Sequence, residues 1–183
     1  MIFDVTQSGN PCFSELHPVL ANLFSTLATD PWERYPEGSK RLLPAPGSSE
    51  EICLDWEDHV QPGLRHQFDS YRTLVAGDLG MMTRTDDTPE GDGVFRLEIP
   101  SGHVDAWLTT LNAMRLAIAS DHDLGERELA GHGFPDLSTE KGHALMQVNF
   151  YAIIQECLLR HIDDGDDEED WDDPEEGESG TGA

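Results

Sequence analysis

Residues 104–120 read VDAWLTTLNAMRLAIAS, and this stretch decides how we expect the chain to fold. At about 100° per residue on a helix, its large apolar side chains fall on one stripe about 120° wide, as on a helix that faces a core. The members of the stripe are Val104, Trp107, Leu108, Leu111, Met114 and Ile118. We therefore predict a long, core-facing helix over residues 104–120.

One charged side chain falls inside this apolar stripe. Arg115 lies among the apolar positions, and Asn112 lies at the edge of the stripe. An unpaired guanidinium in a core is prohibitively costly. Arg115 must therefore reach solvent along its aliphatic stem, pair with a carboxylate and carbonyls inside the protein, or bind a ligand. The sequence leaves these three interpretations open.

A second helix, predicted from a cap at Ser138 to about Ile162, repeats the anomaly. Gln155 lies in the middle of its apolar stripe, and Glu156 lies at the edge. The apolar members are Val148, Ala152, Leu158, Leu159 and Ile162. Polar groups in two apolar stripes suggest one shared network, which would help to fix a unique packing. We expect Arg115 and Gln155 to face the same interior, with the Glu156 carboxylate near the guanidinium.

Most of the remaining chain is also predicted to be helical. A helix begins near Pro18, another begins at residues 48–51, and the chain restarts as a third helix at residues 62–63. Residues 83–93 form a turn-rich loop, and the alternation over residues 94–99 makes the one convincing strand. We therefore expect a mostly all-α fold, a compact bundle of about four to five helices with at most one short strand or hairpin.

The charge divides the chain into two parts. Residues 163–183 hold twelve acidic residues and no basic residue. A segment of like charge with little apolar content cannot offset the entropy lost on ordering. We predict one helical domain over residues 1–162 and a disordered acidic tail over residues 163–183.

The overall charge argues against two classes of partner. Eleven Lys and Arg face 37 Asp and Glu, for a formal net charge of −26. Binding to DNA, RNA or anionic membranes depends on basic side chains, so nucleic acid is an unlikely partner and a membrane is not expected. We find no signal peptide and no apolar run long enough to span a bilayer. Three widely spaced cysteines fit a reducing compartment, so we expect a cytoplasmic protein.

Familiar catalytic and metal-binding motifs are not found in the sequence. The chain has no phosphate-binding glycine loop, no nucleophile elbow and no zinc-binding helix motif. Residues 121–125 resemble the start of a calcium loop, but His132 stands where that loop requires glutamate. Cys157 and His161 could chelate a soft metal, although a buried thiol beside a helix-terminal histidine is the simpler interpretation. We expect no catalytic residue, no metal site and no cofactor.

Three patches of the chain resemble a known family. Residues 106–118, AWLTTLNAMRLAI, resemble the tryptophan–asparagine–arginine signature of an actinobacterial domain of unknown function. Residues 41–44, RLLP, look like its second signature, and Tyr151 with residues 155–158, QECL, resembles its last helix. The family is commonly encoded beside the ClpS protease adaptor and includes the oxidative-stress regulator AosR. The resemblance covers residues 14–162.

This resemblance implies a helical regulatory or adaptor-like protein and not an enzyme. Redox sensing of the AosR type needs a close N-terminal cysteine pair, and Cys12 stands alone, so that switch does not carry over. We expect a non-catalytic protein that acts by binding another protein; the alternative is a transcriptional regulator that binds DNA directly. The expected structural or binding polar cluster comprises Arg115, Asn112, Gln155, Glu156, Trp107 and Arg41.

Overall fold

The computed structural model describes residues 1–47, 49–85, 93–130 and 135–166. The strands are β1 (Ile2–Val5), β2 (Pro11–Leu16), β3 (Thr83–Thr85) and β4 (Val94–Glu98). The α-helices are α1 (Pro18–Ser25), α2 (Pro31–Arg34), α3 (Glu50–His59), α4 (Gln61–Gly80), α5 (Val104–Asp121), α6 (Glu126–Leu129) and α7 (Glu140–Asp166). Three short 3-10 helices are η1 (Thr26–Ala28), η2 (Gly38–Arg41) and η3 (Ser101–His103).

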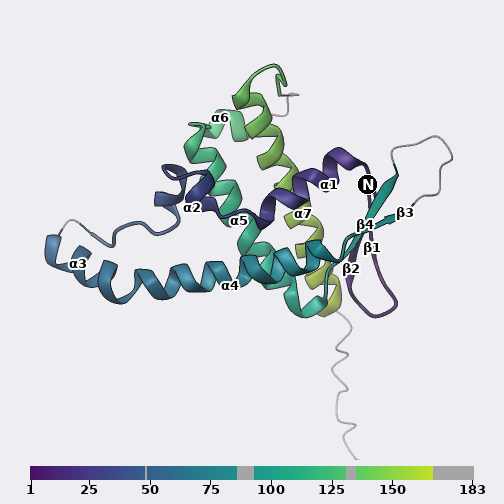
Figure 1. The fold of residues 1–183 in the computed structure, drawn as a ribbon, viewed down its shortest axis with the longest axis horizontal. Coiled ribbons are helices and arrows are strands. Elements are labelled where there is room, and N and C mark those ends of the chain that lie inside the picture. The colour runs from purple at the N-terminus through teal and green to yellow at the C-terminus, as the bar shows by residue number, and fades with distance from the viewer. Residues whose placement is uncertain (48, 86–92, 131–134, 167–183) are drawn as a thin grey trace, which may run out of the picture.

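The four strands form one antiparallel sheet in the order β1-β2-β4-β3. Phe13 in the central strand β2 pairs with Phe3 of β1 on one side and with Leu97 of β4 on the other. The sheet lies beside α1 and the carboxyl end of α4 (Figure 1). The expected all-α bundle with at most one short strand or hairpin is therefore wrong. The described residues form an α/β fold with seven α-helices and a four-stranded sheet.

Sequence periodicity misses this sheet because its strands are short and their pairing is non-local. The strand expected at residues 94–99 is confirmed as β4, but its partners lie before Pro18 and within the predicted loop. The pairing of β2 with β4 also shifts register between Phe13 and Leu16, and Glu15 between them has a φ of 50°. This irregularity buries Phe13 and Leu16 fully although they are three residues apart. A search for strict alternation cannot find such a strand.

The long helices lie where the sequence predicts them. α5 covers the predicted stretch, α3 begins at Glu50, and α4 has Pro62 in its first turn. Pro18 opens α1, where its missing N–H leaves no hydrogen bond unmade. The short helix α6 lies in a stretch predicted to be a loop. Local patterns therefore predict the helices well even though the overall fold class is different.

The last helix differs from its prediction at both ends. Thr139, and not Ser138, accepts a hydrogen bond through its side chain from Gly142 N (3.0 Å) at the start of α7. The helix continues to Asp166, four residues beyond the predicted end. The rest of the predicted acidic tail, residues 167–183, lies outside the described residues. Its division from the folded domain stays a prediction.

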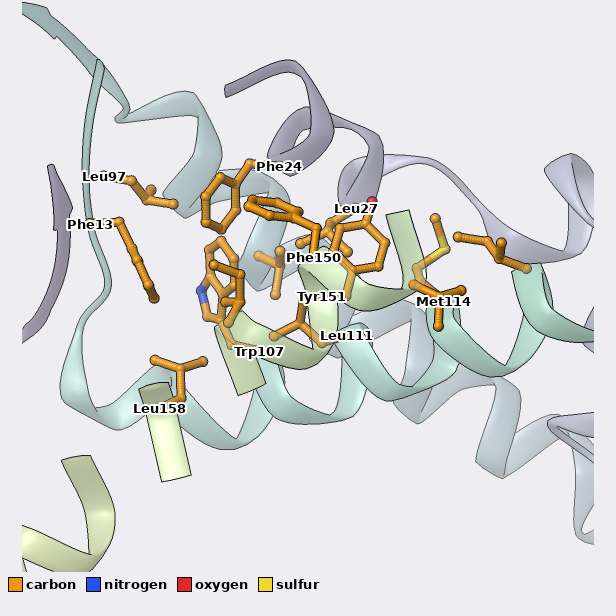
Figure 2. Close-up of a cluster of buried hydrophobic side chains, with 14 of the residues drawn as sticks. Phe13, Phe24, Leu27, Leu97, Trp107, Leu111, Met114, Phe150, Tyr151 and Leu158 are labelled. Carbon is orange, nitrogen blue, oxygen red and sulfur yellow. The ribbon is translucent and has the colours of Figure 1, made fainter. Parts of the chain in front are cut away.

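The core lies where α1, α5 and α7 meet the sheet. Trp107 is fully buried, and the Phe24 ring meets it edge-on with centroids 6.0 Å apart. Phe24 also contacts Phe150 of α7 at 5.2 Å. Figure 2 shows Phe13 and Leu97 of the sheet beside this aromatic group. The helices and the sheet therefore share one core, and α5 runs through its centre.

The turn that contains η2 packs closely against α5. A Cβ atom on Gly38 would lie 1.9 Å from the backbone oxygen of Ala117, so only glycine fits there. The adjacent Ser39 is fully buried, and its hydroxyl lies 2.6 Å from the Pro31 carbonyl oxygen and 2.7 Å from that of Tyr35. These contacts hold the segment from α2 to η2 against the central helix.

Candidate functional site

The structure brings Arg115 and Gln155 together between α5 and α7. The Arg115 guanidinium donates through Nη1 to Gln155 Oε1. Gln155 Nε2 in turn donates to the backbone oxygen of Leu108 at 3.2 Å. The glutamine amide therefore bridges the guanidinium and the backbone of α5. The contact forms because each residue lies within the apolar stripe of its helix, and the two stripes face each other.

The guanidinium of Arg115 lacks a charged partner in the described part of the chain. The side chain is half-buried, and burial lowers the pKa of its guanidinium from the usual value. No described carboxylate lies within 4.0 Å of it, and its buried Nε has no hydrogen-bond partner. A desolvated cation whose partner is a neutral amide is poorly compensated. An added carboxylate or other anion would stabilise it.

Glu156, the carboxylate expected beside Arg115, does not serve as that partner. It is exposed on α7 and pairs with Arg160, one turn further along the same helix. Residues four apart share a helix face, so this local pair forms more readily than a contact with a side chain of α5. The expectation of a carboxylate near the guanidinium is therefore wrong for Glu156.

Exposed apolar side chains lie on both helices within one turn of Arg115 and Gln155. Leu116 of α5 is 44% exposed, and Leu159 of α7, one turn after Gln155, is 50% exposed. Asn112 is also exposed, one turn before both Arg115 and Leu116. We call Asn112, Arg115, Leu116, Gln155 and Leu159 the Arg115 face. A cation with exposed apolar side chains nearby is typical of a protein-binding surface.

Trp107 belongs to a different polar group, deep in the core. Its indole Nε1 donates to Asp78 Oδ2 of α4 at 2.8 Å. His103 Nδ1 lies 3.0 Å from Asp78 Oδ1, and the Asp78 side chain is only 8% exposed. The expectation that Trp107 lies in one cluster with Arg115 is therefore wrong. Trp107 joins α5 to α4, and Arg115 joins α5 to α7.

Arg41 is also separate from the Arg115 face. It is exposed at the end of η2, which packs on α5 at Ala117. Ala117 and Arg115 differ by about 200° around the helix, so they lie on opposite sides of α5. The six predicted residues therefore divide between several places, because helical angles alone do not say which neighbour covers which side.

Sequence reasoning missed Asp78 and the polar group around Tyr151. The Tyr151 hydroxyl contacts Thr26 Oγ1, accepts from Gln147 Nε2 (2.7 Å) and donates to Leu23 O (3.0 Å). Burial raises the pKa of Tyr151. Asp78 lies three residues after the apolar Val75, on the same side of α4, so the angular test applied to Arg115 would have found it.

The cysteines differ in accessibility, and this leads to a chemical prediction. Cys12 is 2% exposed, and burial raises the pKa of both Cys12 and Cys157. Cys53 is half-buried on α3. Because only the thiolate reacts, we expect iodoacetamide near pH 7.5 to modify Cys53 first and Cys12 last, as followed by peptide mass spectrometry. In urea the three rates should converge, whereas early labelling of native Cys12 would contradict the burial seen here.

A hollow with many polar side chains lies between α2, α5 and α7. This open cleft of about 630 Å³ is lined by Arg34, Tyr35, Asp121, His122, Ser138, Thr139, Glu140, His143, Ala144 and Gln147. Its histidines are engaged, since His122 contacts the Tyr35 ring and His143 Nε2 lies 2.6 Å from Leu137 O. Within the described ranges, no three His, Cys, Asp or Glu side chains are grouped to hold a metal ion. None of the described helices is both long and apolar enough to cross a membrane.

One family model matches most of the chain. The profile of a family described as a domain of unknown function, DUF2017, matches residues 14–162. The chain therefore belongs to the DUF2017 family. No curated protein and no solved structure shows a significant similarity to it.

Proposed function

We propose that this chain is a non-catalytic regulatory or adaptor-like protein that binds another protein through the Arg115 face. The observation that carries the proposal is the half-buried guanidinium, which has a neutral partner and no described carboxylate within reach. A carboxylate of a partner protein would complete this site, and the exposed leucines around it would supply apolar contact. Arginine with an apolar surround is a common anchor of protein interfaces.

The process in which we propose that it acts is stress response, transcription regulation or Clp-linked proteolysis. This part rests on the resemblance to the family encoded beside the ClpS adaptor, which includes AosR. A cytoplasmic location is part of the same proposal, because all three cysteines are free thiols.

The charges of the described surface favour a protein partner over DNA. At least five of the eleven basic residues lie against carboxylates of the described ranges, in pairs such as Lys40–Glu37 and Lys141–Glu128. Arg65 stacks on the Trp32 ring at 5.2 Å. A specific DNA-binding protein needs several basic side chains free to contact phosphates. Direct DNA binding is therefore the alternative that the test below must be able to detect.

The experiment is an affinity capture from native lysate with three forms of the full chain. We compare the wild type, Arg115→Met and Arg160→Met by quantitative mass spectrometry. Arg160→Met is the matched control, since it removes the same charge from an exposed site that is already paired. We expect the wild type and Arg160→Met to capture the same protein, and Arg115→Met to lose at least about tenfold of it, as expected for an interface anchor.

One further form and one further measurement separate the alternatives. A chain ending at Asp166 should still capture the partner; stronger capture without residues 167–183 would mean that this acidic segment competes for Arg115. Gel-shift measurements at about 100 mM salt should show no duplex DNA binding by the full chain or by the chain ending at Asp166. Equal capture by Arg115→Met would contradict the proposal, and salt-sensitive DNA binding at sub-micromolar concentration would favour the alternative.

The same site leads to a prediction for stability. Arg115→Met keeps an apolar side chain of similar reach and removes a desolvated cation that has no described carboxylate partner. We expect the free energy of unfolding to stay within about 1 kcal/mol of wild type, because no charge is stranded. Urea unfolding followed by circular dichroism measures it. A loss above about 3 kcal/mol would instead reveal a stabilising ion pair and a structural role.

A further inference from the structure

The acidic sequence that follows α7 contains one large apolar side chain, Trp171. Residues 167–176 read DEEDWDDPEE, so eight acidic residues surround this indole and no basic residue accompanies them. We call these ten residues the Trp171 segment. A surface that binds such a segment must offer a cation beside exposed apolar side chains. The Arg115 face has both, since its exposed leucines lie within one turn of Arg115 and of Gln155.

The Arg115 guanidinium has a hydrogen-bond donor without an acceptor. Nη1 donates to Gln155, and Nη2 makes no hydrogen bond within the described part of the chain. Burial lowers the pKa of the guanidinium, which means that its charge is poorly compensated where it lies. A carboxylate that met Nη2 would compensate this charge, and a charge-assisted hydrogen bond is stronger at a half-buried site than in open water.

The chain that follows α7 is long enough to bring these groups to the face. α7 ends at Asp166, eleven residues beyond Gln155 and seven beyond Leu159. At 1.5 Å per helical residue, the two levels lie about 17 Å and about 11 Å back along the helix. An extended chain covers about 3.4 Å per residue, so Trp171 reaches about 17 Å and the next two residues about 20 and 24 Å. Because the turn at the helix end uses part of this length, the indole arrives near Leu159 and the following carboxylates near the guanidinium.

We propose that the Trp171 segment turns back along α7 and docks on the Arg115 face of its own chain. In this contact the indole packs on Leu159, and an aspartate that follows it in the sequence pairs with the guanidinium. The segment thereby occupies the surface through which we propose partner binding, so the regulatory consequence rests on that proposed function. A carboxylate of the partner and a carboxylate of the segment compete for one guanidinium.

Arg160 lies closer to the end of α7 but offers less to the Trp171 segment. It already pairs with Glu156, and its side chain is 72% exposed. An ion pair in open water contributes little, whereas the half-buried guanidinium of Arg115 has no described carboxylate partner. Other acidic side chains of the protein repel the segment, but at about 150 mM salt this repulsion is largely screened beyond about 8 Å. Local contacts therefore decide the docking site, and they favour the Arg115 face.

Tethering makes even a weak contact of this kind effective. A segment held close to its site by a short connection has an effective concentration of a few millimolar. With a dissociation constant of about 1 mM, the docked segment would lower the apparent affinity for a partner about three- to fivefold. The docked form is then well populated, and a partner that binds more tightly still displaces it.

Nuclear magnetic resonance of the leucine methyl groups tests the contact in the full chain. An aromatic ring shifts the resonances of methyl groups beside it, so the Leu159 methyl signals of the wild type should differ from those of Trp171→Ala. The same comparison is then made with Arg115→Met introduced into both chains. We expect no difference there, because the carboxylates of the Trp171 segment have lost their partner.

Carboxylate variants test the second half of the contact. Asp172→Asn together with Asp173→Asn should move the Leu159 signals to the position seen in Trp171→Ala. Glu178→Gln is the matched control, since it removes a charge from the acidic sequence beyond the Trp171 segment. It should leave the Leu159 signals where the wild type has them. Circular dichroism should give the same helix content for all of these chains.

Three results would overturn the docking. The first is a set of Leu159 methyl signals that is identical in the wild type and in Trp171→Ala. The second is a difference between these two chains that persists with Arg115→Met. The third is a difference that grows with protein concentration, because it would place the segment on a second copy of the chain.

Regulation is tested by the capture from native lysate described above. Trp171→Ala should capture about three- to fivefold more partner than the wild type, and Glu178→Gln should capture the same amount. Equal capture by Trp171→Ala would overturn the competition. If the Leu159 signals respond to Trp171→Ala but no partner is captured, the docking stands and the proposed function fails. If Arg115→Met loses the partner but the Leu159 signals never respond, the proposed function stands and the docking fails.

Discussion

Replacing Gly38 with alanine should cost more than about 4 kcal/mol of folding free energy or prevent folding altogether. The added Cβ would lie 1.9 Å from the backbone oxygen of Ala117, which is held in the hydrogen bonds of α5 and cannot move aside alone. The segment from α2 to η2 would have to separate from the central helix. The buried hydroxyl of Ser39 and its carbonyl partners would then be disrupted as well.

Urea unfolding of Gly38→Ala and Gly80→Ala measures this effect. Gly80, at the end of α4, has no atom within 4 Å of a Cβ built on it, so its replacement should change stability by less than about 1 kcal/mol. A loss below about 1 kcal/mol for Gly38→Ala would show that η2 does not pack against α5 as described.

The second large effect is expected for Asp78→Ala, at about 3 kcal/mol of lost stability. This change leaves the fully buried Trp107 Nε1 without its acceptor and removes the partner of His103. A buried donor left unpaired costs its desolvation free energy, and a small cavity adds to the loss. The three side chains join α4, η3 and α5, so the loss should extend to the packing of α4 against α5.

Two comparisons make the Asp78 result interpretable. Asp78→Asn keeps an oxygen acceptor for the indole and should lose about half as much. Asp105→Ala removes an exposed carboxylate near the start of α5 and should cost at most about 1 kcal/mol. The denaturant midpoints of the three variants measure these losses of stability. Equal losses for Asp78→Ala and Asp105→Ala would mean that the buried hydrogen bonds contribute little.

The candidate site was predictable only in part. The angles on two helices indicate that Arg115 and Gln155 share an interior, and the structure brings them together. The same angles cannot say that Glu156 pairs within its own helix. They also cannot say that Trp107 bonds to a carboxylate 29 residues earlier in the chain. Angles give the direction of a side chain, but its partner depends on which element packs there.

The sequence by itself determined the main helices, their boundaries to within a few residues and the strongly acidic charge. Helical hydrogen bonds and apolar spacing are local, so a short window of sequence contains the information. Only the tertiary structure decided the sheet. Its strands pair Phe13 with Leu97, although helices α1 to α4 lie between these two residues in the sequence. It also decided that Arg115 has a neutral partner and that one side of α4 stays uncovered. These features depend on contacts between distant segments, whose free energy no local pattern expresses.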